Sequence, residues 1–169
     1  MPKGLARSIA RGSPSQAPIW RRDIRIRDAL CNVAGASGIG FGSALIGALP
    51  EGNFAFLGAV AYVQFRGPTS AGLVDTWTGN YGVGTTPADD GTITGADVNI
   101  IPSTAISAAT AELSPLTRGA STAYAVIDAT AGLGLYLNLL VADASISADD
   151  VEITANGILH LAGIFLGDD

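Results

Sequence analysis

Two groups of carboxylates have the residue types and spacing that come closest to a metal site. The stretch TTPADDGTITGADVNI holds three aspartates, and SADDVEI holds two aspartates and a glutamate. Ca²⁺ takes six to eight oxygen ligands, but neither group has the twelve-residue loop with a closing glutamate. Exposed turn carboxylates are therefore the favoured interpretation, and calcium binding is an alternative. The six residues are Asp89, Asp90, Asp97, Asp149, Asp150 and Glu152.

The single histidine and the single cysteine set narrow limits on catalysis. Together they cannot supply the four nitrogen and sulfur ligands of a structural zinc site. His160 lies in the apolar run ILHLAGIFL, and no serine or acid in the sequence is marked as its catalytic partner. Cys31 adjoins another apolar run and is expected to pack as a small hydrophobic residue. No catalytic residue, cofactor site or metal ligand is predicted, and the chain is not expected to be an enzyme.

A glycine-rich segment at 38–43 has the outward form of a phosphate-binding loop. The dinucleotide fingerprint G-x-G-x-x-G places a third glycine where this chain has Ser43, and the P-loop needs a lysine that is missing here. Glycines that allow close strand packing are the favoured interpretation, so nucleotide binding is not expected.

Cations are concentrated at the N-terminal end of the chain. Residues 1–27 contain seven of the nine Lys and Arg residues and one acid, a net charge of +6, whereas the other 142 residues carry −12. Such an asymmetry predicts a basic arm, residues 1–27, and an acidic body, residues 28–169. Only two arginines follow residue 27, so no basic face is expected on the body.

The arm contains residues suited to docking. Ile24 and Ile26 alternate with Arg25 and Arg27, the period of a strand with one apolar and one cationic face. An acidic protein surface and nucleic acid are both open as partners, and this alternation together with Trp20 favours protein. The predicted docking residues are Arg7, Arg11, Trp20, Arg21, Arg22, Ile24, Arg25, Ile26 and Arg27.

The elements that position these residues are mostly strands. Short apolar or alternating runs are separated by turn residues, which is typical of an antiparallel sandwich or barrel. Asn156-Gly157 predicts a type I′ turn in a terminal hairpin, and 103–113 predicts one short helix. Strands are predicted at 38–47, 54–65, 72–77, 80–84, 92–100, 122–128, 133–142, 150–155 and 157–166.

The uncharged stretch 29–50 is long enough to span a bilayer, and it follows a cluster of arginines. Repeated Gly, Ser and Asn interrupt it, so a membrane-spanning helix at 29–49 is kept only as an alternative. The long apolar runs at 54–65 and 133–142 predict further burial between subunits.

The C-terminal half carries a resemblance. The segments GNYGVGTTPADDGTITGADVNIIPSTAI (79–106) and YLNLLVADASISADDVEITANGILHLAGIFLGDD (136–169) resemble small structural proteins of tailed-bacteriophage virions. Such proteins tend to carry a similar stretch ending D-I-I-P-S-T, then L-N-L, a terminal strand pair and a closing Leu-Gly-Asp. The resemblance extends over about 90 residues, and residues 1–30 do not share it.

The resemblance implies a fold and a role. The relatives look like capsid decoration (cement) or head-fibre-base proteins with β-sandwich or jelly-roll folds, often trimeric. It therefore implies an all-β, jelly-roll-like antiparallel sandwich in the phage head, made in the bacterial cytoplasm, that docks on the major capsid protein. A neck, tail or head-fibre-base component is an alternative within the virion. A membrane-associated protein and a calcium- or carbohydrate-binding sandwich are alternatives of other classes.

Overall fold

The computed structural model describes residues 19–36, 39–67, 76–110, 113–121, 125–129, 132–142 and 150–167. These residues form nine strands and one 3-10 helix, Gly95–Asp97. The strands are β1 (Ile19–Ala36), β2 (Ile39–Ala48), β3 (Asn53–Arg66), β4 (Thr76–Gly84), β5 (Ile101–Thr110), β6 (Thr117–Ala120), β7 (Ala125–Asp128), β8 (Gly134–Val141) and β9 (Asp150–Gly167).

The strands pair in a nested pattern. β1 pairs with β9, β2 with β8, and β4 with β5, while β6 and β7 pair with successive parts of β3. All of these pairs are antiparallel, and β6 and β7 together occupy the place of one interrupted strand. A chain that is doubled back and wound in this way is a jelly roll. The predicted all-β, jelly-roll-like fold is confirmed.

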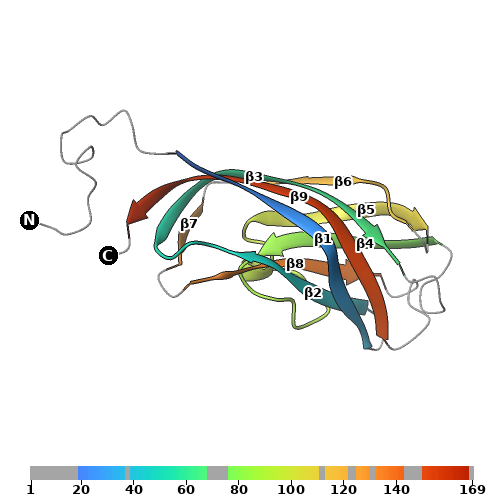
Figure 1. The fold of residues 1–169 in the computed structure, drawn as a ribbon. Helices are drawn as coiled ribbons and strands as arrows, with labels where there is room; N and C mark the ends of the chain where they lie inside the picture. Colours follow the sequence, from blue (N-terminus) through green and yellow to red (C-terminus); the bar gives the residue numbers. More distant parts are fainter. Residues whose placement is uncertain are drawn as a thin grey trace, which may run out of the picture.

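Hydrogen bonding runs continuously through the order β5-β4-β8-β2-β1-β9-β3-β6. The sheet folds over where Ala34–Ala36 of β1 pair with Ile39–Phe41 of β2, and this seam divides it into two layers. One layer is β1-β9-β3 with β6 and β7, and the other is β2-β8-β4-β5 (Figure 1).

The core lies between the two layers because alternate residues of each strand point inward. In β8, for example, Leu135, Leu137 and Leu139 are fully buried. The ring of Phe65 on β3 lies 6.4 Å from that of Trp77 and 5.7 Å from that of Tyr81, both on β4. These aromatic contacts join the layers at centroid distances that stabilise ring pairs.

The loop 85–100 covers the outer side of β4 and β8. Asn138 on β8 is completely buried beneath it: its Oδ1 accepts a hydrogen bond from Ala88 N–H, and its Nδ2 donates to the carbonyls of Thr86 and Asp97. A Cβ at Gly84 would overlap the backbone of Ala96 and Asp97, so glycine lets the loop lie directly on the strand. At Asn138 the run 133–142 is thus buried on its outer side by its own chain, and burial between subunits stays a prediction.

The predicted terminal hairpin is wrong. Asn156 and Gly157 lie in the middle of the single strand β9, where Gly157 pairs with Ile26 of β1 and Val63 of β3. Asn156 accepts from the backbone N–H of Asp28 at 3.0 Å and donates to its carboxylate at 2.9 Å, holding a bulge where Asp28 has a φ of 43°. A Cβ at Gly157 would overlap the Tyr62 carbonyl oxygen. This Asn-Gly pair therefore serves a bulge and a close strand approach.

Three other predicted elements differ. Residues 103–110 of the predicted helix 103–113 lie in strand β5, because pairing with β4 outweighs the helix propensity of its alanines. The predicted strand 92–100 is part of the covering loop and includes the 3-10 helix. Residues 76–84 form one strand rather than parts of two.

The body begins earlier than predicted. β1 starts at Ile19, so residues 19–27 belong to the sandwich and not to an extended arm. Residues 29–48 lie largely in β1 and β2, which replaces the alternative of a helix at 29–49. Among the described residues, no helix is long and apolar enough to cross a membrane.

Candidate docking face

The cationic segment of β1 has two faces that differ sharply. Ile24 and Ile26 are 7% and 3% exposed and belong to the core, whereas Arg25 and Arg27 point outward and are exposed. Strand alternation produces this division, as the sequence predicted. The location of β1 differs from the predicted extended arm, because its inward residues pack within its own chain. Ile24 and Ile26 are therefore core residues and not docking residues.

Trp20 and Arg22 also point toward the interior side of the layer. The Trp20 ring lies 5.5 Å from that of Phe54 and packs against the core. The guanidinium of Arg22 donates a hydrogen bond to the carbonyl of Ala48 at the end of β2. The Arg22 contact therefore joins the two layers, whereas Trp20 packs beside β3 of its own layer. The predicted docking residues Arg7 and Arg11 lie outside the described residues.

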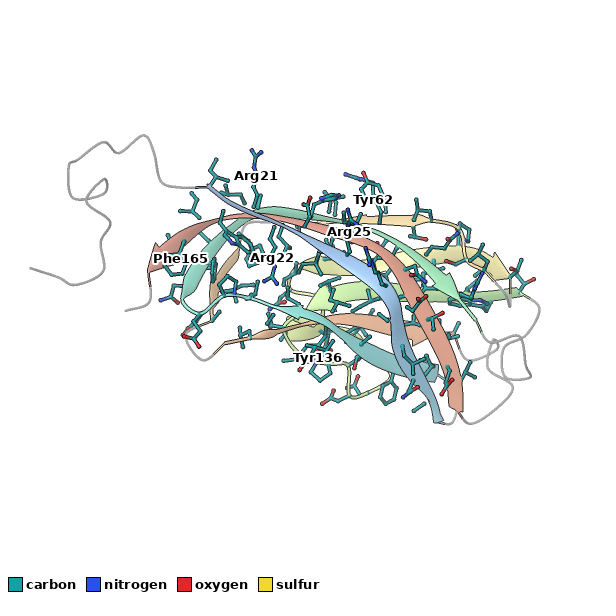
Figure 2. All side chains as sticks on the ribbon, viewed as in Figure 1. Arg21, Arg22, Arg25, Tyr62, Tyr136 and Phe165 are labelled. Carbon is teal, nitrogen blue, oxygen red and sulfur yellow. The ribbon has the colours of Figure 1, made fainter. Side chains whose placement is uncertain are left out.

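Strand pairing brings distant arginines onto the outer side of the β1-β9-β3-β6 layer. Arg25 pairs with Ile158, Ile158 with Tyr62, and Tyr62 with Arg118 across four strands. We call this surface the basic face, and Figure 2 shows Arg21 and Tyr62 projecting from it while Tyr136 projects from the opposite side of the molecule. Its cations are Arg21, Arg25, Arg27, Arg66 and Arg118.

The expectation that the body lacks a basic face is thus wrong. Arg66 and Arg118 are isolated in the sequence, and pairing aligns them with the arginines of β1. A local pattern does indicate the orientation of Arg66. Val63 and Phe65 point inward, so strand alternation places Arg66 on the outer side. Among the described residues, none of the arginines on this face forms an ion pair with a carboxylate.

Asp23 and His160 form a pair near the centre of the basic face. Asp23 lies directly opposite His160 in the β1–β9 ladder, and its Oδ1 is 2.8 Å from His160 Nδ1. The Tyr62 ring stands edge-on to the imidazole at 6.4 Å. His160 is therefore hydrogen-bonded within its own chain. No local pattern identifies Asp23 as the partner, because 137 positions separate the two residues.

A shallow depression of about 550 Å³ adjoins this pair, and we call it the central depression. A bulge in β3 between Phe56 and Gly58 shapes one wall. The lining consists mainly of small or aliphatic residues such as Gly58 and Ala162, with Arg21 and Arg118 among its polar members. Val60 and His160 also line the depression, in the row between these two arginines.

An apolar row borders the basic face at the end nearest Ile19. Ile19 pairs with Ile164, Ile164 with Ala55, and Ala55 with Val126, so all four lie side by side on the outer surface. Val126 is 71% exposed and Ile19 55% exposed. The outer surface of this layer therefore combines unpaired cations with accessible apolar side chains.

Three of the remaining sequence candidates have structural roles, while Asp89 and Glu152 are exposed. Asp90 accepts hydrogen bonds from the Thr92 N–H and hydroxyl, which lower the pKa of its carboxyl group. Asp97 accepts from the Thr86 hydroxyl at 2.6 Å. Cys31 is fully buried, and burial raises its pKa to about 12, as expected of a packing residue. Among the described residues, no group of three or more His, Cys, Asp and Glu residues is placed to hold a metal ion. Asp149 lies outside the described residues.

Comparisons with known proteins add little to these findings. No protein-family model and no curated protein matches the chain. One chain of a solved structure of infectious bursal disease virus, Gx strain, aligns with 89% of this chain at 16% identity and a TM-score of 0.37. The present chain spans 34% of that chain's length.

Proposed function

We propose that this chain is a non-enzymatic structural protein of a tailed-bacteriophage virion, specifically a decoration or cement protein of the head. In this role it binds the major capsid protein lattice and stabilises the shell. The sequence resemblance over residues 79–169 supports the family, and the jelly-roll winding agrees with the fold that this resemblance implies.

The observation that carries the proposal is the basic face. A rigid layer of paired strands presents five exposed arginines, and these have no carboxylate partners among the described residues. Unpaired guanidinium groups on a fixed surface are well suited to bind carboxylates of a partner protein. Docking therefore involves the face of the body as well as the residues that precede Ile19, including Arg7 and Arg11. Assembly as a homotrimer is part of the proposal.

The decisive experiment is the stoichiometry of this protein in purified particles. Quantitative mass spectrometry would measure its copy number against that of the major capsid protein. A lattice decoration protein occurs in a fixed, high ratio to the capsid protein, while a neck or tail component contributes only a single ring of copies. Absence from purified particles would overturn the virion proposal.

A truncation pair tests how much of the docking depends on the N-terminal segment. Deletion of residues 1–18 leaves every described strand intact, so we expect a folded protein. Deletion of residues 1–27 removes half of β1 and leaves part of β9 without its partner, so we expect misfolding. Unchanged shell binding by the shorter deletion would show that residues 1–18 do not dock.

A further inference from the structure

We propose that the central depression is the docking site for a short acidic segment of a protein partner, with the apolar row as a second contact. The inference rests on the proposed function and specifies its docking chemistry. The site is defined by Arg21, Arg118, the Asp23–His160 pair, and the exposed side chains of Leu57 and Val126.

The two arginines stand at diagonally opposite corners of the depression. Arg21 is in register with Gly58 through Ala162, and Arg118 is in register with Tyr62, four residues further along β3. Three strand spacings across and four residues along give a diagonal of about 20 Å between the backbones. An extended segment of about six residues spans that distance at ~3.3 Å per residue. The partner segment therefore carries carboxylates near both ends.

The surface between the corners can accept such a segment. Gly58, Ala120 and Ala162 leave space above the sheet beside the Asp23–His160 pair. Asp23 is the one carboxylate that lines the depression. Its Oδ1 already contacts His160 Nδ1 at 2.8 Å, so this carboxylate has a partner on the same surface. The two guanidinium groups are therefore the sites where incoming carboxylates are favoured.

The distribution of apolar side chains favours protein over nucleic acid as the occupant. Exposed Leu57 and Val126 lie beside the depression, and aliphatic contacts of this kind are typical of protein interfaces. A nucleic-acid backbone needs a continuous cationic path, and on β1 the carboxylate of Asp23 interrupts the series of arginines. An acidic protein segment with an aliphatic residue can bind both the arginines and the exposed aliphatic side chains of this surface.

The test compares three charge reversals on one face. Arg21→Glu and Arg118→Glu change the depression, while Arg66→Glu makes the same change about 13 Å along β3 from the Tyr62 register. That separation exceeds the Debye length of about 8 Å at physiological salt, so Arg66→Glu is a matched control. All three side chains are exposed, so each variant should retain the wild-type melting temperature within a few degrees.

Binding is measured by co-sedimentation with shells that contain the major capsid protein and lack this protein. We expect Kd to rise at least tenfold for Arg21→Glu and for Arg118→Glu, and to stay within twofold for Arg66→Glu. Val126→Ser, at a position too exposed to affect folding, should raise Kd about fivefold. Equal losses for all three reversals would overturn the inference, since a general charge effect would then explain binding.

Two further outcomes separate this inference from the proposed function. If wild-type protein fails to bind the shells, the decoration function fails as well. If wild-type protein binds and neither depression variant weakens it, the function stands and the docking site is wrong. An oligodeoxythymidine probe tests the other class of partner. Binding of this probe that is lost in Arg21→Glu and Arg118→Glu, with shell binding unchanged, would assign the face to nucleic acid.

Discussion

The outer sides of the two layers carry different chemistry although the layers share one core. On the β2-β8-β4-β5 layer, the loop 85–100 lies over the strands, and buried Asn138 holds it through three hydrogen bonds. On the β1-β9-β3-β6 layer, arginines, a histidine and aliphatic residues remain accessible. On the first surface the loop pairs the buried polar groups within the chain, although Leu45 at the β2 end stays 65% exposed. The second leaves its guanidinium groups without carboxylate partners among the described residues, which is the reason to assign docking to it.

The comparison indicates that the outer side of one layer contributes to stability, while the outer side of the other is available to bind a partner. Substitutions under the covering loop should change folding, whereas substitutions on the basic face should leave folding nearly unchanged. Substitutions of buried residues on the inner sides should affect folding similarly in both layers. The variants that follow test these expectations through the free energy of unfolding.

Asn138→Leu should have the largest effect, a loss of about 4 kcal/mol in the free energy of unfolding. The substitution leaves the Ala88 N–H and the carbonyls of Thr86 and Asp97 without their partner, and each unsatisfied buried group costs about 1–3 kcal/mol. Urea unfolding measures the loss. Asp89→Ala, at an exposed position in the same loop, is the control and should cost less than about 1 kcal/mol. Equal effects of the two would contradict the assigned role of Asn138.

Asn156→Ala should cost about 1–2 kcal/mol because it removes both hydrogen bonds that hold the bulge at Asp28. This effect is smaller than that of Asn138→Leu because the bulge is exposed and water can replace the lost partner. Thermal melts compare the variant with Asn32→Ala, which changes an exposed asparagine on the same layer. A loss as large as that of Asn138→Leu would show that the two layers are not distinct in this respect.

The inner sides should respond to alkaline pH in both layers. Burial raises the pKa of Cys31 from its ordinary value of 9.0 to about 12, and desolvation raises that of Tyr81 on the opposite layer to about 12. The folded state keeps these protons when the unfolded state has lost them, so stability is full below the ordinary pKa and falls as pH rises toward 12. For Cys31 the loss is about 1 kcal/mol at about pH 10.

Urea unfolding at a series of pH values measures this slope. Cys31→Ala lowers stability at every pH through lost packing, but it should flatten the decline that begins near pH 9. An unchanged slope in the variant would show that the thiol does not contribute. A thiol reagent gives an independent check, since wild-type Cys31 should react only at the rate of unfolding.

Arg25→Ala should have the smallest effect, within about 0.5 kcal/mol of wild type. Arg25 lies between Arg27 and Asp23 on an exposed strand surface, and it has no ion pair with a carboxylate among the described residues. Removal of one like charge should slightly stabilise the protein at low salt, and the difference should vanish at high salt. Chemical unfolding at two salt concentrations measures it. A loss above about 1 kcal/mol would show that the basic face contributes to folding.

Local patterns predicted much of the fold. Alternation in 54–65 and apolar continuity in 133–142 correctly indicated strands, because each segment has a hydrogen-bonded partner strand on both edges. The alanines of 103–113 and the Asn-Gly pair at 156–157 led to wrong elements. In both cases pairing with distant strands decides the conformation, and a local propensity of a few tenths of a kcal/mol per residue cannot outweigh it.

The candidate site was predictable only in part. The arginines of β1 and their alternation with isoleucines were visible in the sequence, and Arg25 and Arg27 are exposed as expected. The sequence did not show which residues complete the face, since Arg118 and Arg25 are aligned only by the pairing of four strands. Asp23 likewise meets His160 only because the first described strand pairs with the last. A property that depends on register between remote strands has no local signature.

The pairing of β1 with β9 also sets the order in which the molecule can form. On the ribosome, β1 emerges before the other strands, and its partner β9 is absent until residues 150–167 have been synthesised. Folds with such distant pairings close slowly, because a large loop must be restrained before the contacts repay the lost entropy. During that interval the apolar inner side of β1 is open to other chains. Production of this protein should therefore be sensitive to the speed of synthesis and to chaperone supply, even though the finished sandwich is tightly paired.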